Sequence, residues 1–95
     1  MTVLNDQIAV ITGASSGIGR AIALNLAQQG AKLALVGRNL ERLEEVAAIA
    51  QKTAPKVITY SIDLTVEENI GKLKTTLERD FGRVDLLVHS AGAFS

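Results

Sequence analysis

Apolar runs and helical spacings alternate along the chain, beginning with a strand and a helix. Residues 7–12 form a short run rich in β-branched residues, which is typical of a buried strand. The spacing then changes, and residues 17–29 predict a helix whose apolar face consists of residues three or four positions apart: Ile18, Ala21, Ile22 and Leu26. Gly30 follows, where a glycine that ends a helix is expected.

A second strand and helix follow the same scheme. Residues 32–37 predict a strand, and Asn39 is a suitable N-cap for the next helix. The apolar stripe of that helix is expected to contain Leu40, Leu43, Ala47 and Ala50. Pro55 disfavours helical geometry in the residue before it, so we expect the helical segment to stop near Ala54.

The last part of the chain adds a strand, a helix and a final strand. Residues 57–62 predict the third strand, and Thr65 and Glu68 have the spacing of a capping box at a helix start. An amphipathic stripe follows and Gly82 ends it; its residues are Val66, Ile70, Leu73, Leu77 and Phe81. Residues 84–89 predict the fourth strand.

The order β-α-β-α-β-α-β with short connections predicts an α/β protein with a parallel sheet. Each helix carries the chain back across the sheet, so that successive strands run the same way through right-handed crossovers. The chain has 95 residues, which favours one domain.

Composition narrows the possible functions. Acidic and basic residues balance at ten each, so no overall field attracts nucleic acid or an anionic membrane. The chain contains no cysteine, and its single histidine and scattered carboxylates lack the spacing of metal ligands, so we expect neither disulfides nor a metal site. Residues 1–7 are polar and do not resemble a secretory signal, so we expect a soluble, cytoplasmic protein.

The sequence Thr-Gly-Ala-Ser-Ser-Gly-Ile-Gly at residues 12–19 carries the strongest functional signal. It follows the first predicted strand and opens the first predicted helix, whose N-terminus presents unpaired backbone N–H groups and a positive dipole end. Glycines at Gly17 and Gly19 leave those amides open to a diphosphate, and Gly13 permits a sharp turn out of the strand. Ser15 and Ser16 add hydroxyl donors. This context predicts a phosphate-binding loop.

The pattern Thr-Gly-x-x-x-Gly-Ile-Gly resembles the short-chain dehydrogenase/reductase family. The resemblance covers essentially the whole chain and implies a Rossmann-like sheet of strand order 3-2-1-4, with residues 1–95 forming an NAD(P)-binding half-domain that stops after the fourth strand. Asp63-Leu64-Thr65 is similar to the segment that contacts adenine, and Ser90-Ala91-Gly92 to the end of an Asn-Asn-Ala-Gly stretch that lies along the cofactor. His89 and Ser90 occupy the two asparagine positions. The expected cofactor-binding residues are Gly13, Ser15, Ser16, Gly17, Ile18, Gly19, Arg38, Asn39, Asp63, Leu64, Ser90, Ala91 and Gly92.

The end of the second strand bears on the choice between NAD and NADP. A carboxylate at this point binds the ribose 2′-hydroxyl of NAD, whereas arginine accommodates the 2′-phosphate of NADP. This chain has Gly37-Arg38-Asn39 and no acid there. A guanidinium binds phosphate with two parallel hydrogen bonds, so we expect NADP rather than NAD.

The catalytic residues that the resemblance implies, a serine and a Tyr-x-x-x-Lys pair, are not found in these 95 residues. The single tyrosine, Tyr60, is followed four places later by Leu64 and is expected to be a packing residue. Lys72 and Lys74 are expected on the solvent side of the third helix. We expect His89 to be a hydrogen-bonded structural residue rather than a base.

An unpaired fourth strand suggests that the chain associates with itself. In the strand order that the resemblance implies, Leu86, Leu87 and Val88 would lie on an edge, and a long apolar edge invites pairing with another chain. We therefore expect a homodimer through the fourth strands, or through exposed helices. Three interpretations remain open: the cofactor-binding portion of an NADP-dependent oxidoreductase acting on a carbonyl or alcohol, a non-catalytic binding or structural module, and an engineered half-fold.

Overall fold

A computed structural model describes residues 4–15 and 17–89 of the chain. Strands and helices alternate, as the sequence predicts. Their bounds are β1 (Ile8–Thr12), α1 (Gly17–Gln28), β2 (Lys32–Gly37), α2 (Leu40–Ala50), β3 (Val57–Ser61), α3 (Glu67–Phe81) and β4 (Leu86–His89). None of the helices in these ranges is long and apolar enough to cross a membrane.

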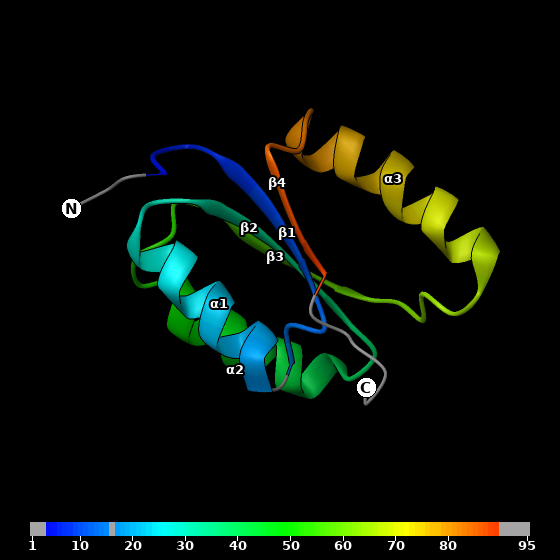
Figure 1. Ribbon diagram of the computed structural model, residues 1–95, viewed down its shortest axis with the longest axis horizontal. Helices are drawn as coiled ribbons and strands as arrows, with labels where there is room; N and C mark the ends of the chain where they lie inside the picture. The colour runs from blue at the N-terminus through cyan, green and yellow to red at the C-terminus, as the bar shows by residue number, and fades with distance from the viewer. Residues whose placement is uncertain (1–3, 16, 90–95) are drawn as a thin grey trace.

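The four strands form one parallel sheet in the order β3-β2-β1-β4 (Figure 1). The chain moves outward from β1 through β2 to β3 and then crosses back to the other side of β1 to form β4. The predicted Rossmann-like α/β fold and strand order are therefore confirmed.

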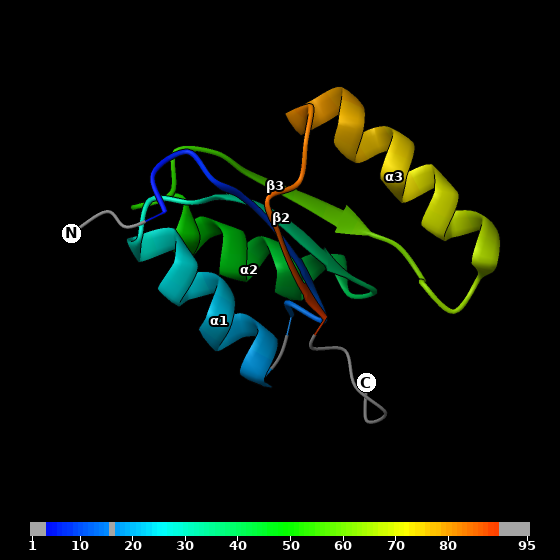
Figure 2. The same ribbon diagram turned by 45° about the horizontal axis from the view of Figure 1, so that its top comes forward.

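Helices cover both faces of the sheet. Figures 1 and 2 show α1 and α2 side by side on one face, while α3 lies on the other. Side chains alternate along a strand, so each strand supplies both layers. In β1, for example, Ile11 belongs to the core beneath α1 and α2, and Val10 belongs to the core beneath α3.

The predicted apolar stripes are confirmed in part: the helices bury Leu26, Leu43, Ala47, Ala50, Leu73 and Leu77, but other stripe residues are exposed. Ile18 is 74% exposed and Ala21 is also exposed, whereas α1 buries Gly19, Ala23, Leu26 and Ala27. Three further stripe residues are exposed as well: Leu40 in α2, Val66 at the N-cap of α3, and Ile70 in α3. The predictions for these residues were wrong because spacing alone does not decide how a helix is rotated about its axis. Small residues let α1 approach the sheet closely, and that contact sets the rotation.

The helix ends confirm some predictions and correct one. Asn39 caps α2, since its side-chain oxygen accepts a hydrogen bond from the Arg42 backbone N–H at 3.1 Å. Gly30 and Gly82 have positive φ angles of 88° and 84° after α1 and α3. The predicted capping box at Thr65 does not form, because the Thr65 hydroxyl donates to Asp63 instead and α3 begins two residues later.

Other boundaries shift slightly. Helix α2 ends at Ala50, and residues 51–53 continue as a turn before Ala54, earlier than the boundary that Pro55 suggests. Strand β4 begins at Leu86 rather than at residue 84. Among the described residues β4 pairs with β1 alone, and Leu87 on this edge is 65% exposed, as the sequence predicts.

Candidate functional site

The carboxyl ends of all four strands meet at one edge of the sheet. Strand β1 ends at Thr12, β2 at Gly37, β3 at Ser61 and β4 at His89. The strand order reverses between β1 and β4, since β2 and β3 lie on one side of β1 and β4 on the other. Open α/β sheets bind ligands in the crevice outside the carboxyl ends of the strands at such a reversal.

The loop from β1 into α1 adopts a backbone that favours glycine. Gly13 and Gly17 have φ angles of 69° and 53°, in the left-handed region that other L-residues rarely adopt. Ala14, fully buried between them, donates its N–H to the Val36 carbonyl at 3.2 Å and ties the loop to β2. A Cβ added at Gly17 would meet nothing within 4 Å, so the space beside this residue is open. The described part of the loop, residues 13–15 and 17, therefore links the end of β1 to the start of α1.

Gly19 has a different environment from Gly17. It is buried on the face of α1 that packs on the sheet. A missing side chain there allows close packing between helix and sheet. Whether Gly19 also opens the loop to a ligand, as the sequence predicts, stays a prediction.

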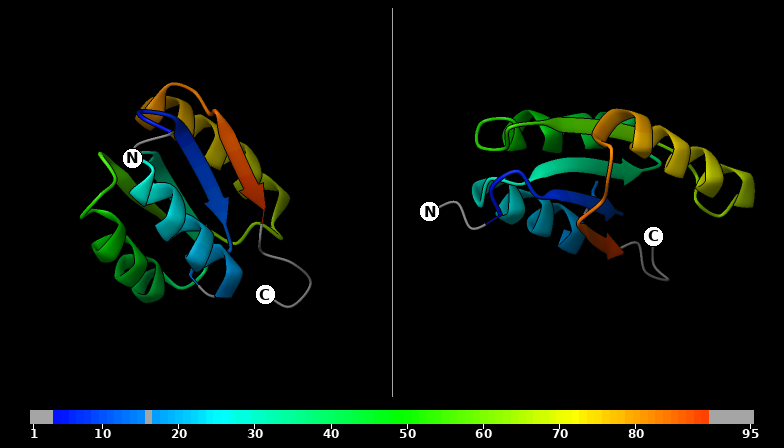
Figure 3. Two further views of the ribbon diagram at one scale, coloured as in Figure 1. Left: turned by 60° about the vertical axis from the view of Figure 1, so that its left-hand side comes forward. Right: turned by 90° about the horizontal axis from the view of Figure 1, so that it is seen from above.

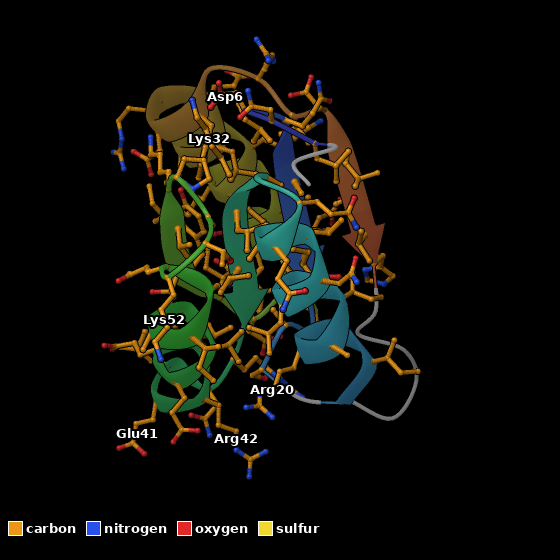
Figure 4. All side chains as sticks on the ribbon, turned by 90° about the vertical axis from the view of Figure 1, so that its left-hand side faces the viewer. Asp6, Arg20, Lys32, Glu41, Arg42 and Lys52 are labelled. Carbon is orange, nitrogen blue, oxygen red and sulfur yellow. The ribbon has the colours of Figure 1, made fainter. Side chains whose placement is uncertain are left out.

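The charge at the start of α1 suits an anion. Acidic side chains stabilise a helix N-terminus, and α2 and α3 both have them in the first turn: Glu41, and Glu67 with Glu68. Helix α1 has none and instead carries Arg20 there. Figure 4 shows the side chains of Arg20 and Arg42 at the same end of the molecule, opposite Asp6 and Lys32. The positive dipole end of α1 is thus left without a carboxylate of its own helix.

The end of β2 lies against the loop. A Cβ at Gly37 would come within 3.4 Å of Ser15 Oγ and 3.2 Å of a Leu43 methyl carbon, so glycine lets Ser15 lie beside this strand end. Arg38 follows and is exposed, and the Ser61 hydroxyl donates to its carbonyl at 3.2 Å. No ion pair joins Arg38 to another side chain in the part of the chain that the structure describes. Its charge contributes to lowering the pKa of Asp63, which follows the neighbouring strand β3.

The segment after β3 is held by its own side chains. Asp63 Oδ1 accepts hydrogen bonds from the Thr65 hydroxyl at 2.6 Å and from the Thr65 backbone N–H at 2.9 Å. These bonds, with a smaller contribution from the charge of Arg38, hold the pKa of Asp63 below its ordinary value. Leu64 packs partly against the core beneath α3. Asp63 is therefore an ionised, oriented acceptor at the same edge.

Sequence reasoning missed the contact that joins β1 to β4. Thr12 and His89 are partners in the parallel register, and Thr12 Oγ1 lies 2.7 Å from His89 Nδ1. Both residues end strands predicted to be parallel, and that shared position was the signal that could have paired them. Ser16, Ser90, Ala91 and Gly92, which were also predicted to bind the cofactor, lie outside the described residues.

The side chain of Tyr60 is part of the core and not of this edge. It is buried in the core beneath α3, and its hydroxyl donates to Asp80 Oδ2 at 2.8 Å. Burial raises the pKa of Tyr60 well above its ordinary value, and the hydrogen bond to Asp80 raises it further. The prediction that Tyr60 is a packing residue is confirmed, as is the solvent exposure of Lys72 and Lys74.

Three comparisons with known proteins agree with this geometry. An uncharacterized oxidoreductase of Staphylococcus epidermidis is 48% identical over 92 residues, which cover 97% of this chain and 39% of that protein. The NAD+-bound structure of a xylitol dehydrogenase superposes with a TM-score of 0.86 at 35% identity, over 90% of this chain and 33% of that one. L-Sorbose reductase from Gluconobacter frateurii, complexed with NADPH and L-sorbose, gives 0.86 at 37% identity, over 94% and 34%.

The match to a family is equally extensive. The chain spans about two fifths of the length of the curated relatives that it matches. The family model for short chain dehydrogenases matches residues 7–95, which include the loop, all four strands and all three helices. The chain therefore belongs to the short-chain dehydrogenase family.

Proposed function

We propose that this chain binds a nicotinamide dinucleotide, with the diphosphate on the amides at the start of α1. The observation that carries the proposal is the loop: a glycine-dependent turn, anchored to β2 by Ala14, that delivers an open helix N-terminus without a carboxylate in its first turn. The xylitol dehydrogenase structure above has NAD+ bound, and the L-sorbose reductase structure is a complex with NADPH.

The remaining contacts follow from the sheet edge. Asp63 and Leu64 would lie next to the adenine, and Arg38 and Asn39 next to its ribose. Asn39 contributes its backbone and amide group, because its side-chain oxygen already caps α2. The full set proposed to bind the cofactor is Gly13, Ser15, Ser16, Gly17, Ile18, Gly19, Arg38, Asn39, Asp63, Leu64, Ser90, Ala91 and Gly92. Ile18 suits this role better than a core role, since its side chain is exposed at the loop.

We propose NADP as the preferred cofactor, because Arg38 is exposed at the end of β2 without an ion-pair partner among the described residues. Calorimetric titration with NADP+ and NAD+ tests both proposals. Arg38→Ala is expected to weaken NADP+ binding about tenfold to a hundredfold, the loss of a charge-assisted contact, and to leave NAD+ binding nearly unchanged. Lys74→Ala is the matched control, since it removes one positive charge from the solvent face of α3. Equal affinity for both cofactors would refute the preference, and failure of both to bind would refute the site.

We further propose that a longer protein containing this chain transfers hydride between NADPH and a carbonyl or alcohol substrate. The Tyr-x-x-x-Lys pair needed for that chemistry is not found in the 95 residues, since the single tyrosine, Tyr60, is followed four places later by Leu64. A spectrophotometric assay of NADPH oxidation over a panel of ketones and sugars tests the activity. Cofactor binding without turnover by such a protein would favour the alternative of a non-catalytic binding module.

For the chain by itself we propose a homodimer through the β4 edge, where Leu86 and Leu87 are exposed. Light scattering after size-exclusion chromatography measures the mass, and Leu87→Lys is expected to shift a dimer to monomer. A dimer that survives this change would favour pairing through exposed helices, and a stable monomer at micromolar concentration would refute the proposal. The cytoplasmic location expected from the sequence stays a prediction, to be checked by cell fractionation.

A further inference from the structure

The ring of His89 lies at the reversal of strand order, beside the end of β1. Figure 3 shows β1 and β4 running side by side to the same edge of the sheet. Thr12 at the end of β1 is buried, while His89 is exposed, and the Oγ1–Nδ1 distance between them is 2.7 Å. The imidazole therefore contacts the residue from which the phosphate loop departs and can exchange a proton with solvent.

The hydrogen bonds around Thr12 accommodate two protonation states of the ring. In the neutral tautomer with its proton on Nε2, the Thr12 hydroxyl donates to Nδ1; in the other neutral tautomer, Nδ1 donates to Thr12 Oγ1. When the ring takes a proton from solvent, Nδ1 becomes a donor to Thr12 Oγ1, and the hydroxyl can turn to the Val88 carbonyl, 3.5 Å away. The ends of β1 and β4 stay joined in both states, and only the charge of the ring changes.

Among the described residues, no ion pair balances the positive charge that a protonated His89 ring carries. Strand β1 and the loop through Ser15 contain no ionisable side chain. The elements that begin or end at this edge contribute Arg20 from α1, Arg38 after β2, Asp63 after β3, and Glu67 and Glu68 at the start of α3. No ion pair joins His89 to a carboxylate within residues 4–15 and 17–89.

We propose that His89 is a positioning residue that holds Thr12 and couples proton uptake to dinucleotide binding, so that affinity rises as the pH falls. The inference rests on the proposed function. A diphosphate at the start of α1 brings negative charge to the same edge and favours the imidazolium ring, so binding takes up a proton. By linkage, lower pH strengthens binding.

Calorimetry from pH 6 to pH 8.5 tests the coupling. NAD+ is the first probe because it lacks the 2′-phosphate of NADP+, whose own titration falls near pH 6. The Kd for NAD+ is expected to rise about fivefold from pH 6 to pH 8.5, as for one partly screened unit charge. His89→Asn, which keeps a hydrogen-bonding group without a charge, is expected to show a flat profile. Asp63 stays ionised throughout this range, since its pKa lies below the ordinary value.

Proton NMR on the unaltered chain gives a second test that needs no variant. The chain has a single histidine, so one imidazole C2–H resonance reports His89 directly. Its titration midpoint is expected to move to higher pH when NAD+ binds. An unmoved midpoint, or the same pH dependence of Kd in the unaltered chain and in His89→Asn, would overturn the inference and leave the proposed function intact. Failure of NAD+ and NADP+ to bind at every pH would overturn both.

Discussion

Replacing Gly17 by alanine tests the backbone on which the proposed site depends. A Cβ at this position meets nothing within 4 Å, so steric contact adds no cost. The φ of 53° is what disfavours alanine, by about 1 kcal/mol net. The entropy of unfolding, about 2.1 cal/mol/K per residue, amounts to about 0.2 kcal/mol/K for a chain of this length. Gly17→Ala is therefore expected to lower the Tm by about 5 °C.

Gly71 offers a matched control for this change. It lies within α3 and is exposed, a Cβ there also meets nothing within 4 Å, and its φ is not positive. Alanine in a helix interior is favoured over glycine by about 0.5–1 kcal/mol, so Gly71→Ala is expected to raise the Tm by a few degrees. The two identical substitutions should therefore act in opposite directions.

The stability of both variants is measured by thermal and urea unfolding, monitored by circular dichroism. NADP+ titration adds a second readout: relief of backbone strain in Gly17→Ala would move the amides at the start of α1, so affinity should fall, whereas Gly71→Ala should bind as before. Tm shifts of the same sign in the two variants would refute the argument from φ.

Further predictions concern the core and the acid stability. Leu43→Ala is expected to lower the free energy of unfolding by about 2–5 kcal/mol in urea titrations, because Leu43 is fully buried. Leu40→Ala, at a position 47% exposed, should cost no more than about 0.5 kcal/mol, and equal losses would contradict the observed burial. The hydrogen bond from the Ile8 backbone N–H and, to a smaller extent, the one from Arg83 hold the pKa of Asp85 below its ordinary value. Ionised Asp85 thus stabilises the fold fully above about pH 4, and this contribution is lost as the pH falls through the lowered pKa. Asp85→Asn should flatten the decline of the urea midpoint between pH 5 and pH 2.5, and an unchanged slope would refute this role.

The elements themselves could be predicted because their signals are local. The run at Lys32–Gly37 was bounded correctly, since the four inner residues of this interior strand are apolar and buried and the strand ends in glycine. The start of β4 was placed too early: just before the strand, Asp85 donates its backbone N–H to the Ile8 carbonyl, and its Oδ2 accepts the Ile8 N–H, both at 2.9 Å. Periodicity of apolar residues does not reveal such a contact between a polar side chain and a strand backbone.

The candidate site could be predicted in part for the same reason. The glycines around residues 13–17 reveal the turn because positive φ angles limit the choice of residue. The environment of Ile18 could not be predicted, because spacing does not distinguish a side chain that faces the sheet from one at the exposed start of a helix. The packing of Gly19 and Ala23 against the sheet decides that question.

By itself the sequence determined the alternation of strands and helices, the glycine turn and the cap at Asn39, since each depends on residues within a few positions of one another. Only the tertiary structure decided that Thr12 meets His89 and that Ile8 meets Asp85, two pairs separated by 77 positions. These contacts arise because the chain crosses back over the sheet and places β4 in register beside β1, and no local pattern of side chains encodes that register.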